Sequence, residues 1–259
     1  MNGKVAMISA ASKGLGFAVA RALAAEGASV SISSSNATSL QAAKASIERD
    51  SNRAILDCVA DVRSGDAIEK WYETTVQRFG GVDLLFVNSG GPPAGGFMSF
   101  DDKAWQDAVD LLLLSAVRMV RTVLPSLKQR GGGSVVFTAS SSVKEPIENL
   151  TLSNVVRATV PALSKSLARE FAVNSIRFNT LVPGRIDTGR VRSLDAFNAQ
   201  KKNIPVEDQR RLMQAAIPLG RYGEVEEYAR AAVFLLSPAS SYVTGAVLQV
   251  DGGMIRSVM

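Results

Sequence analysis

Residues 5–26 read VAMISAASKGLGFAVARALAAE, and this stretch decides the fold. The apolar run from Val5 to Ser9 predicts a β-strand, and Gly14 to Glu26 is typical of a helix with small residues on one face. Between the two lies a turn that contains glycine. A strand, a glycine turn and a helix N-terminus make an anion site, because backbone N–H groups and the helix dipole face a diphosphate. The alternative is a tight turn that needs only the backbone freedom of glycine.

Short apolar runs and amphipathic helical patterns alternate along the rest of the chain. We expect strands at 29–33, 54–59, 82–87, 135–139, 176–181 and 246–250, and helices near 38–50, 65–79, 101–129 and 151–172. Continuous apolar strands are typical of a parallel sheet covered on both faces. The pattern therefore predicts an α/β fold, a Rossmann-like doubly wound parallel sheet of about seven strands with helices on both faces. We expect one domain over 1–259, with the polar, irregularly helical residues 189–215 forming a lid.

The composition excludes several classes of protein. With 259 residues and 46% hydrophobic content, the chain is expected to bury a sizeable core. Cys58 is the only cysteine, so no intramolecular disulfide forms; it lies on a predicted buried strand, where packing is its expected role. The N-terminus is typical of a first strand and not of a signal peptide, and no apolar run approaches about 18 residues. We therefore expect a cytoplasmic protein without a membrane span.

The charges point to a small ligand. The net charge is +5, with Lys and Arg scattered and no aromatic-studded basic stripe, so no nucleic-acid partner is expected. A phosphate-rich cofactor or an anionic substrate explains the positive charge more economically. The chain contains no histidine, which removes His-based triads and His metal sites, and no metal is expected.

Residues 140–170 read SSSVKEPIENLTLSNVVRATVPALSKSLARE, a segment whose frame resembles the active-site segment of the short-chain dehydrogenases/reductases. Further segments match that family in order. The glycine turn resembles its Thr-Gly-x-x-x-Gly-x-Gly pattern, with Ser9 for Thr and Ala10 for the first Gly. The later matches are Asp61-Val62, Asn88-Ser89-Gly90, Pro183 to Thr188, Gly220 to Glu224 and Thr244 to Gly253. The chain is thus similar to the non-extended members, often 3-oxoacyl-(acyl-carrier-protein) reductases, over nearly its whole length.

The resemblance implies a dinucleotide site and a small-molecule substrate. Asp61-Val62 corresponds to the pair that contacts adenine, and Pro183 to Thr188 to the segment that covers the nicotinamide. Ala10 adds a methyl group where the family's backbone is tight. The residues that the resemblance assigns to the cofactor are Ser9, Ser12, Lys13, Gly14, Leu15, Gly16, Ser34, Ser35, Asp61, Val62, Asn88, Ser89, Gly90, Arg157, Pro183, Gly184, Ile186 and Thr188.

The end of the second strand bears on the choice between NAD and NADP. An acidic residue there would bond both ribose hydroxyls and repel a 2′-phosphate. That position holds Ser34, followed by Ser35, while Lys13 can reach a phosphate from the glycine turn. We therefore predict NADP(H) as the cofactor. A solvated strand end and a plain surface lysine are the alternatives for these residues.

The catalytic set departs from the family that the chain resembles. That family uses a Ser, a Tyr and a Lys, with an Asn on the long helix. Ser140 matches the Ser, but Ser153 stands at the Tyr position, Arg157 at the Lys position and Leu112 at the Asn position. An aliphatic hydroxyl ionises several units above a phenol, and an Arg is effectively always protonated. Ser153 is therefore a poor acid, and Arg157 cannot readily relay a proton.

Two functions remain open. The first is an oxidoreductase acting on a carbonyl, a hydroxyl or an activated double bond, since hydride transfer belongs to the cofactor. Its catalytic residues would be Ser140, Ser153 and Arg157, with a proton from Lys144, from Ser140 through water, or from solvent. The second is a catalytically silent NADP(H)-binding protein with a sensing or partner role.

Two further features concern surfaces. The run Leu111 to Leu114 is apolar around a whole helical turn, which predicts burial on every face. In the fold that the chain resembles, this helix and the helix from Thr151 form a subunit interface, so we expect a homotetramer, with burial inside the monomer as the alternative. Arg185 and Arg190 either bind an anionic substrate tail or lie solvated; Tyr222 is the tyrosine expected nearest to a substrate loop.

Overall fold

Seven parallel strands form one sheet in the computed structural model, which describes residues 1–258, in the order β3-β2-β1-β4-β5-β6-β7. The strands are β1 Val5–Ile8, β2 Ser29–Ser34, β3 Leu56–Val59, β4 Leu84–Val87, β5 Gly133–Thr138, β6 Ile176–Pro183 and β7 Val247–Val250. The strand order reverses between β1 and β4, so the sheet is doubly wound about this point. The predicted Rossmann-like α/β fold is confirmed.

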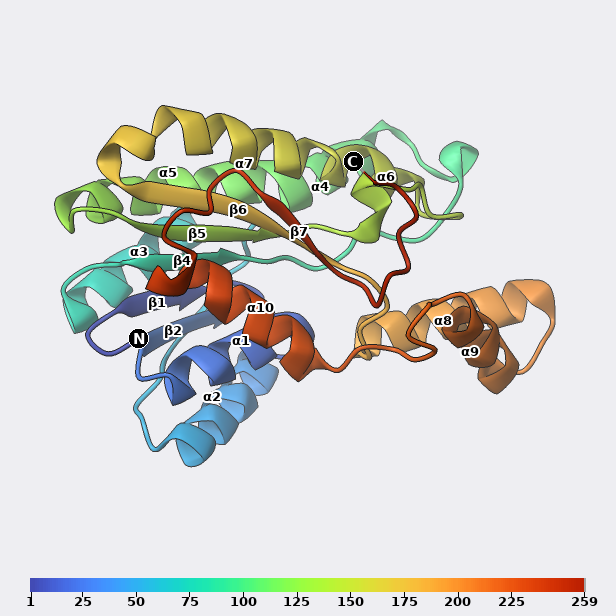
Figure 1. Ribbon diagram of the computed structural model, residues 1–259, viewed down its shortest axis with the longest axis horizontal. Helices are drawn as coiled ribbons and strands as arrows, with labels where there is room; N and C mark the ends of the chain where they lie inside the picture. Colours follow the sequence, from blue (N-terminus) through green and yellow to red (C-terminus); the bar gives the residue numbers. More distant parts are fainter. Residues whose placement is uncertain (259) are drawn as a thin grey trace.

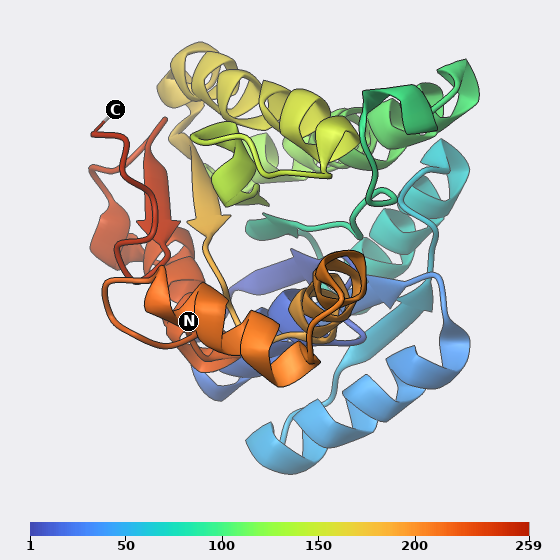
Figure 2. The ribbon, with the colours of Figure 1, turned by 90° about the vertical axis from the view of Figure 1, so that its right-hand side faces the viewer.

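Helices cover both faces of the sheet (Figure 1). One layer contains α1, α2 and α10, and the other contains α3 to α7. Beyond the carboxyl ends of the strands, α8 and α9 lie in front of the sheet (Figure 2). The helices are α1 Gly14–Ala25, α2 Ala37–Ser51, α3 Gly65–Phe79, α4 Asp102–Val109, α5 Ser115–Gln129, α6 Thr151–Arg157, α7 Thr159–Glu170, α8 Gly189–Lys202, α9 Val206–Ala215 and α10 Val225–Leu236.

The first strand explains why the strands are apolar throughout. Successive side chains of a strand point to opposite faces, and both faces here are covered. Ala6 and Ile8 join the apolar core under α1 and α10, whereas Met7 joins the core under α3 and α5. All three are almost fully buried. Each large side chain buried in this way stabilises the fold by roughly 1.5–3 kcal/mol.

The long helix expected over 101–129 is interrupted. A π-helical turn, Asp110–Leu114, separates α4 from α5, and the N–H of Ser115 donates to the carbonyl of Asp110 five residues back. Leu112, within this turn, is 3% exposed and packs against Leu152 and Val156 of α6. The other three leucines of the run are only partly buried within the chain, so the expected burial on every face is wrong for the single chain.

The helix expected over 151–172 is also broken in two, at Ala158. Pro161 has no N–H and cannot donate to the carbonyl of Arg157 four residues back, which weakens the helix at this point. The Thr159 hydroxyl donates to the carbonyl of Val156 at 2.6 Å. The break ends α6 at Arg157, next to the ligand side of the sheet.

Two other expectations need correction. Residues 189–215 are not irregular, because they form the regular helices α8 and α9. Cys58 packs against the core as expected, but its strand β3 lies at the edge of the sheet and leaves it only partly buried.

The turn after β1 contains an alanine in a conformation that favours glycine. Ala10 has a φ of 48°, in the left-handed region, where a Cβ crowds the following carbonyl. The resemblance placed a glycine at this position, and the backbone keeps the glycine-like shape although the residue differs. Gly14, with a φ of 61°, is the first residue of α1.

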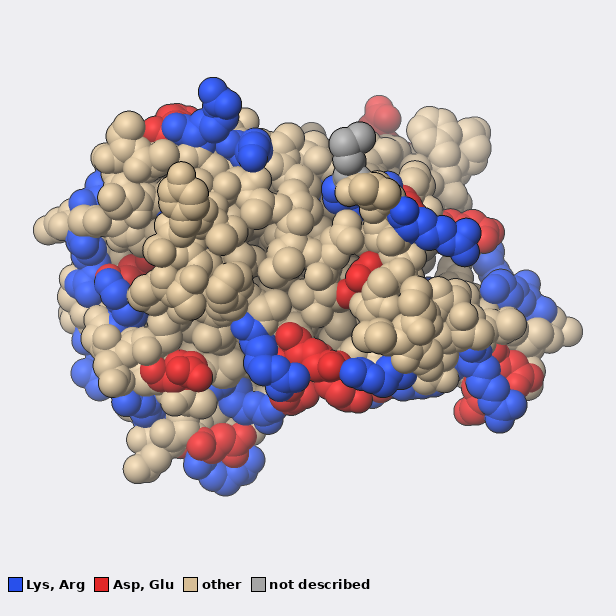
Figure 3. All heavy atoms as spheres, viewed as in Figure 1, with Lys and Arg blue, Asp and Glu red and all other residues tan. Residues whose placement is uncertain are grey.

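The surface carries both signs of charge. On the face in Figure 3, acidic and basic side chains of the described residues are interspersed, and no continuous basic stripe crosses it. No helix within residues 1–258 is both long and apolar enough to pass through a membrane.

Candidate functional site

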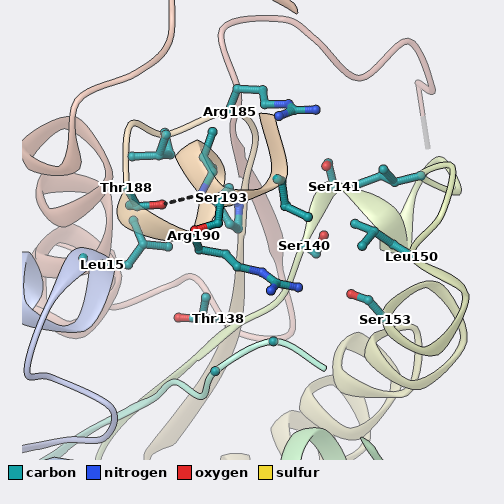
Figure 4. Close-up of a pocket in the computed structure, with 18 of the residues that line it drawn as sticks. Leu15, Thr138, Ser140, Ser141, Leu150, Ser153, Arg185, Thr188, Arg190 and Ser193 are labelled. Atoms are coloured by element: carbon teal, nitrogen blue, oxygen red, sulfur yellow. Dashed lines mark hydrogen bonds between the residues drawn. The ribbon is translucent and has the colours of Figure 1, made fainter. Parts of the chain in front are cut away.

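The carboxyl ends of β1, β2, β4, β5 and β6 border a cleft of about 970 Å³. Ligands of doubly wound sheets bind at this edge, where the loops diverge from the reversal of strand order. The cleft is also lined by the start of α8 and, from the end of the chain, by Met254 and Ile255. Figure 4 shows the side chains around it.

One corner of the cleft has the features of an anion site. Ser12, Lys13, Gly14 and Leu15 line it from the turn before α1. No side chain caps α1, and no acidic residue lies in its first turn, so its first N–H groups remain available to an anion. These residues fit the diphosphate of a dinucleotide.

The end of β2 adjoins this corner. Ser34 and Ser35 both line the cleft, and the Ser34 hydroxyl donates to the Ser12 hydroxyl at 3.0 Å. Lys13 is exposed beside them. The geometry thus brings together the three residues, Lys13, Ser34 and Ser35, on which the NADP(H) prediction depends.

The floor of the cleft is held by close backbone contacts. Asn88 donates through its side-chain amide to the carbonyl of Ala10 at 3.3 Å. A Cβ on Gly16 would lie 2.5 Å from that carbonyl oxygen and 2.9 Å from the Asn88 amide nitrogen. Only glycine therefore fits at position 16. Gly16 is required by the close packing of α1 and does not itself line the cleft.

Several residues predicted for the cofactor do not line the cleft. Ser9 is fully buried below it, and Val62 packs in the core. Asp61 forms a two-point ion pair with Arg63, whose guanidinium holds the pKa of that carboxyl below its ordinary value. The predicted residues that do line the cleft are Ser12, Lys13, Gly14, Leu15, Ser34, Ser35, Asn88, Ser89, Gly90, Arg157, Pro183, Gly184, Ile186 and Thr188.

The three predicted catalytic residues share the opposite end of the cleft. Ser140 follows β5, and Ser153 and Arg157 lie one helical turn apart on α6. Figure 4 shows Ser140 and Ser153 on the same side of the cleft, with Thr188 and Leu15 across from them. Leu112 does not line the cleft, because it belongs to the apolar cluster beneath α6. Lys144 also lies outside the lining.

Arg157 is a buried cation without a carboxylate partner among residues 1–258. It is 9% exposed, and it donates to the carbonyl oxygens of Gly90, at 3.0 Å, and Thr138, at 3.5 Å. Burial lowers the pKa of its guanidinium to about 10, and the nearby charge of Arg190 contributes to the shift. The group stays protonated at neutral pH, but its charge is poorly stabilised.

The two arginines near the lid differ. Arg185 forms an ion pair with Asp195 at 2.7 Å, and both side chains are largely buried. Arg190 donates to the carbonyl of Pro92 at 2.9 Å, and burial lowers the pKa of its guanidinium. In Figure 4 its side chain extends from the start of α8 toward the side of the cleft where Ser140 and Ser153 lie.

No tyrosine lines the cleft among the described residues. Tyr222 donates to Asp195 at 2.8 Å under the lid helices, and burial together with this bond raises the pKa of its phenol. Tyr228 donates to the Thr138 hydroxyl at 3.2 Å, and burial raises the pKa of this phenol as well. Tyr222, the tyrosine expected nearest to a substrate loop, thus bonds to α8 of the lid, whereas Tyr228 bonds to Thr138, which lines the cleft.

The sequence did not single out Glu145 and Glu148, although both line the cleft. Glu145 accepts the backbone N–H groups of Arg256, at 2.7 Å, and Ser257, at 3.1 Å. It thereby holds the end of the chain against the cleft. The position of both glutamates between Ser140 and Ser153 could have indicated that they lie near the cleft. The partners of Glu145, Arg256 and Ser257, lie far away in the sequence.

Comparisons with known proteins agree with this architecture. The family model described as Enoyl-(Acyl carrier protein) reductase matches residues 9–255. Dehydrogenase/reductase SDR family member 4 from Oryctolagus cuniculus is 34% identical over 251 residues, which are 96% of this chain and 93% of the relative.

Two solved structures are similar over nearly the whole chain. L-sorbose reductase from Gluconobacter frateurii, complexed with NADPH and L-sorbose, is 30% identical with a TM-score of 0.94, covering 100% of this chain and 98% of that chain. A short-chain oxidoreductase from Pseudomonas aeruginosa PAO1, described as containing an atypical catalytic center, is 29% identical with a TM-score of 0.90, covering 98% of each chain.

The buried charge of Arg157 leads to a prediction about stability. Arg157→Met should raise the free energy of unfolding by about 1 kcal/mol, because it removes a buried charge that has no acidic partner. Urea denaturation at pH 7 measures the change.

The matched control is Arg177→Met, since Arg177 serves four acceptors: Leu235 O, Ser237 O, Ser240 Oγ and Val243 O. Its loss should lower stability by about 1–3 kcal/mol. If both variants lowered the free energy of unfolding equally, Arg157 would be a structural arginine.

Proposed function

Since the chain belongs to the short-chain dehydrogenase/reductase family of oxidoreductases, we propose that it is an NADP(H)-dependent enzyme acting on a carbonyl, a hydroxyl or an activated double bond of a small molecule. The observation that carries the proposal is the shared cleft: an uncapped helix N-terminus with Ser12, Lys13 and Ser34 at one end, and Ser140 with Ser153 at the other. We propose the cytoplasm as its location.

The preference for NADP(H) is supported by what surrounds the end of β2. Two serine hydroxyls and the Lys13 ammonium lie there, and none of the cleft-lining residues at this end is acidic. Hydroxyls and an ammonium bind a 2′-phosphate, whereas a carboxylate would repel it. The similar L-sorbose reductase is complexed with NADPH.

Cofactor preference is directly measurable. NADPH should bind about tenfold tighter than NADH, because a phosphate gains charge-assisted hydrogen bonds from Lys13 and the serines. Lys13→Ala should reduce the difference between the NADPH and NADH affinities. Lys4→Ala, far from the cleft, should leave that difference unchanged. Fluorescence titration gives both affinities. Equal affinities for the two cofactors in the natural protein would refute the assignment.

The lid remains part of the proposal. Residues 189–215 supply Arg190, Phe197 and Met213 to the cleft wall. If these residues close over the cofactor, hydrogen exchange of α8 and α9 amides should slow during the same NADPH titration, and unchanged exchange would remove the lid role.

The bound cofactor supplies the hydride, and the chain's own residues orient the substrate. We infer that the Ser140 and Ser153 hydroxyls donate hydrogen bonds to the substrate oxygen. The Arg157 charge would stabilise negative charge that develops on that oxygen, as preorganised cations do in dry sites. Because Lys144 does not line the cleft, the proton would come through Ser140 and water, or from solvent.

The alternative is a catalytically silent NADP(H)-binding protein. It is favoured by one observation: no phenol lines the cleft among residues 1–258, and Ser153 occupies the place of the expected proton donor. General acid catalysis typically contributes about 10²–10⁴-fold, so its loss slows a reaction without abolishing hydride transfer. NADPH oxidation against a panel of ketones, imines and enoyl compounds separates the two functions.

Restoring the family's catalytic set tests the assignment of the site. The triple variant Ser153→Tyr, Arg157→Lys, Leu112→Asn should raise turnover of a simple ketone by about tenfold or more, because it supplies a phenol with a lowered pKa. Leu112→Asn places an amide in an apolar cluster and should lower stability by about 1–3 kcal/mol, so Tm is measured alongside.

The control is the same triple variant with Ser153→Phe, which has the ring but no hydroxyl. High wild-type turnover that survives Ser140→Ala and falls in the triple variant would show that a different group acts as the catalyst.

We also propose a homotetramer. Val155 on α6 is 54% exposed, and Leu111, Leu113 and Leu114 are only partly buried within one chain. Apolar residues on adjacent helices are typical of a face covered by another subunit. Light scattering should give a mass near four times 27.4 kDa. A monomer at micromolar concentration would contradict the interface.

A further inference from the structure

Two guanidinium groups face one cleft without an acid to neutralise either of them. Arg157 comes from the end of α6 and Arg190 from the start of α8, and both line the cleft. Neither forms an ion pair with any carboxylate in residues 1–258, whereas Arg185 on the same wall is paired with Asp195. Arg157 donates to the carbonyl of Gly90 and Arg190 to the carbonyl of Pro92, so both guanidinium groups lie against the same loop after β4. Two like charges placed in this way in a partly dry site are unfavourable unless an anion joins them.

Arg157 does not behave as a structural arginine. A guanidinium has five N–H donors, and within residues 1–258 Arg157 uses them on two carbonyl oxygens, one of them at 3.5 Å. Arg177 is the internal comparison, because it too has no acidic partner among the described residues but serves four acceptors within 3.4 Å. The incomplete set of partners around Arg157 leaves donors for a ligand in the cleft.

Arg190 is held in place by its surroundings. A Cβ on Gly91 would lie 2.9 Å from a terminal nitrogen of Arg190, so the glycine makes room for the guanidinium. The same terminal nitrogen donates to the carbonyl oxygen of Pro92 at 2.9 Å, which fixes this end of the side chain. Arg190 thus extends from the start of α8 to the loop after β4.

The acidic residues of the cleft are occupied elsewhere. Glu145 accepts the backbone N–H groups of Arg256 and Ser257, and Glu148 accepts the side-chain amide of Asn149 at 3.3 Å. Both line the same cleft, yet neither pairs with Arg157 or Arg190 in the described residues. The charge of the two arginines is therefore left for a ligand.

We propose that Arg157 and Arg190 form a carboxylate-binding subsite, and that the substrate is a small organic acid whose reducible carbonyl or double bond lies within a few bonds of its carboxylate. This inference rests on the proposed function, because it names the substrate class of that same cleft. Guanidinium groups bind carboxylates through paired, charge-assisted hydrogen bonds. Ser140 and Ser153 lie at the same end as Arg157, so the reacting group and the carboxylate fit on one small molecule.

A second source of negative charge is the cofactor itself. Its diphosphate would lie at the α1 N-terminus, where Gly14 and Leu15 line the cleft across from Ser140 and Ser153. Arg190 extends away from Leu15, toward the serines (Figure 4). The substrate carboxylate is therefore the better partner, and the two sources predict different effects on NADPH affinity.

The test compares carboxylates with neutral amides of the same shape. Formate, acetate, benzoate and cinnamate are each titrated against the corresponding primary amide, by calorimetry, into protein loaded with NADPH. At least one carboxylate should bind about tenfold tighter than its amide, and Arg190→Gln should remove most of that difference. Arg192→Gln is the matched control, because Arg192 lies on the same helix, is exposed and pairs with Asp187 outside the cleft. It should leave the preference intact.

Three results would each overturn the subsite. The first is the absence of a carboxylate preference in all four pairs. The second is an Arg190→Gln variant that keeps the preference in full. The third is a loss of NADPH affinity of more than about threefold in Arg190→Gln, which would assign the anion to the cofactor. Failure of wild-type protein to bind NADPH at all would instead refute the proposed function, so the two failures are distinguishable.

Discussion

The paired hydrogen bonds between Ser9 and Asn88 are the constraint on which the rest of the cleft depends. The Ser9 hydroxyl donates to the Asn88 carbonyl at 2.7 Å and accepts the Asn88 N–H at 2.8 Å, which aligns the ends of β1 and β4. These are the strands between which the order reverses. With both ends aligned, the Asn88 amide reaches Ala10 and α1 can approach closely at Gly16. A buried hydroxyl outside the cleft thus positions the turn that lines it.

The structure separates the parts that hold the scaffold from the parts that set the chemistry. Leu112, Leu152 and Val156 form an apolar cluster below α6, and this cluster supports the helix that presents Ser153 and Arg157. Leu112 adds to this apolar support, and its side chain has no polar atom that could hold a water. Burial of apolar surface keeps the geometry, whereas the polar groups at its edge set what the geometry can do.

Arg157 shows how the fold tolerates an unfavourable group. Burial lowers the pKa of its guanidinium, and Arg190 adds repulsion, so the charge opposes folding slightly. The surrounding core supplies enough stability to hold it there. Residues that destabilise a fold in this way tend to lie at binding sites, where a bound ligand compensates their charge. The uncompensated charge is thus consistent with a site whose final partner is an anion.

The sequence by itself determined the parallel sheet and the glycine turn after its first strand, because apolar periodicity and glycine placement act within roughly 20 residues. The helical pattern did not reveal the break at Ala158, although Pro161 stands in the sequence, nor the π-helical turn Asp110–Leu114. Only the tertiary structure decided which charges are compensated. Arg157 bonds to a carbonyl 67 residues away and Glu145 to an N–H 111 residues away, and no local pattern encodes such partners. Parallel strands need long crossover connections, so the residues that meet at their ends are distant in the chain.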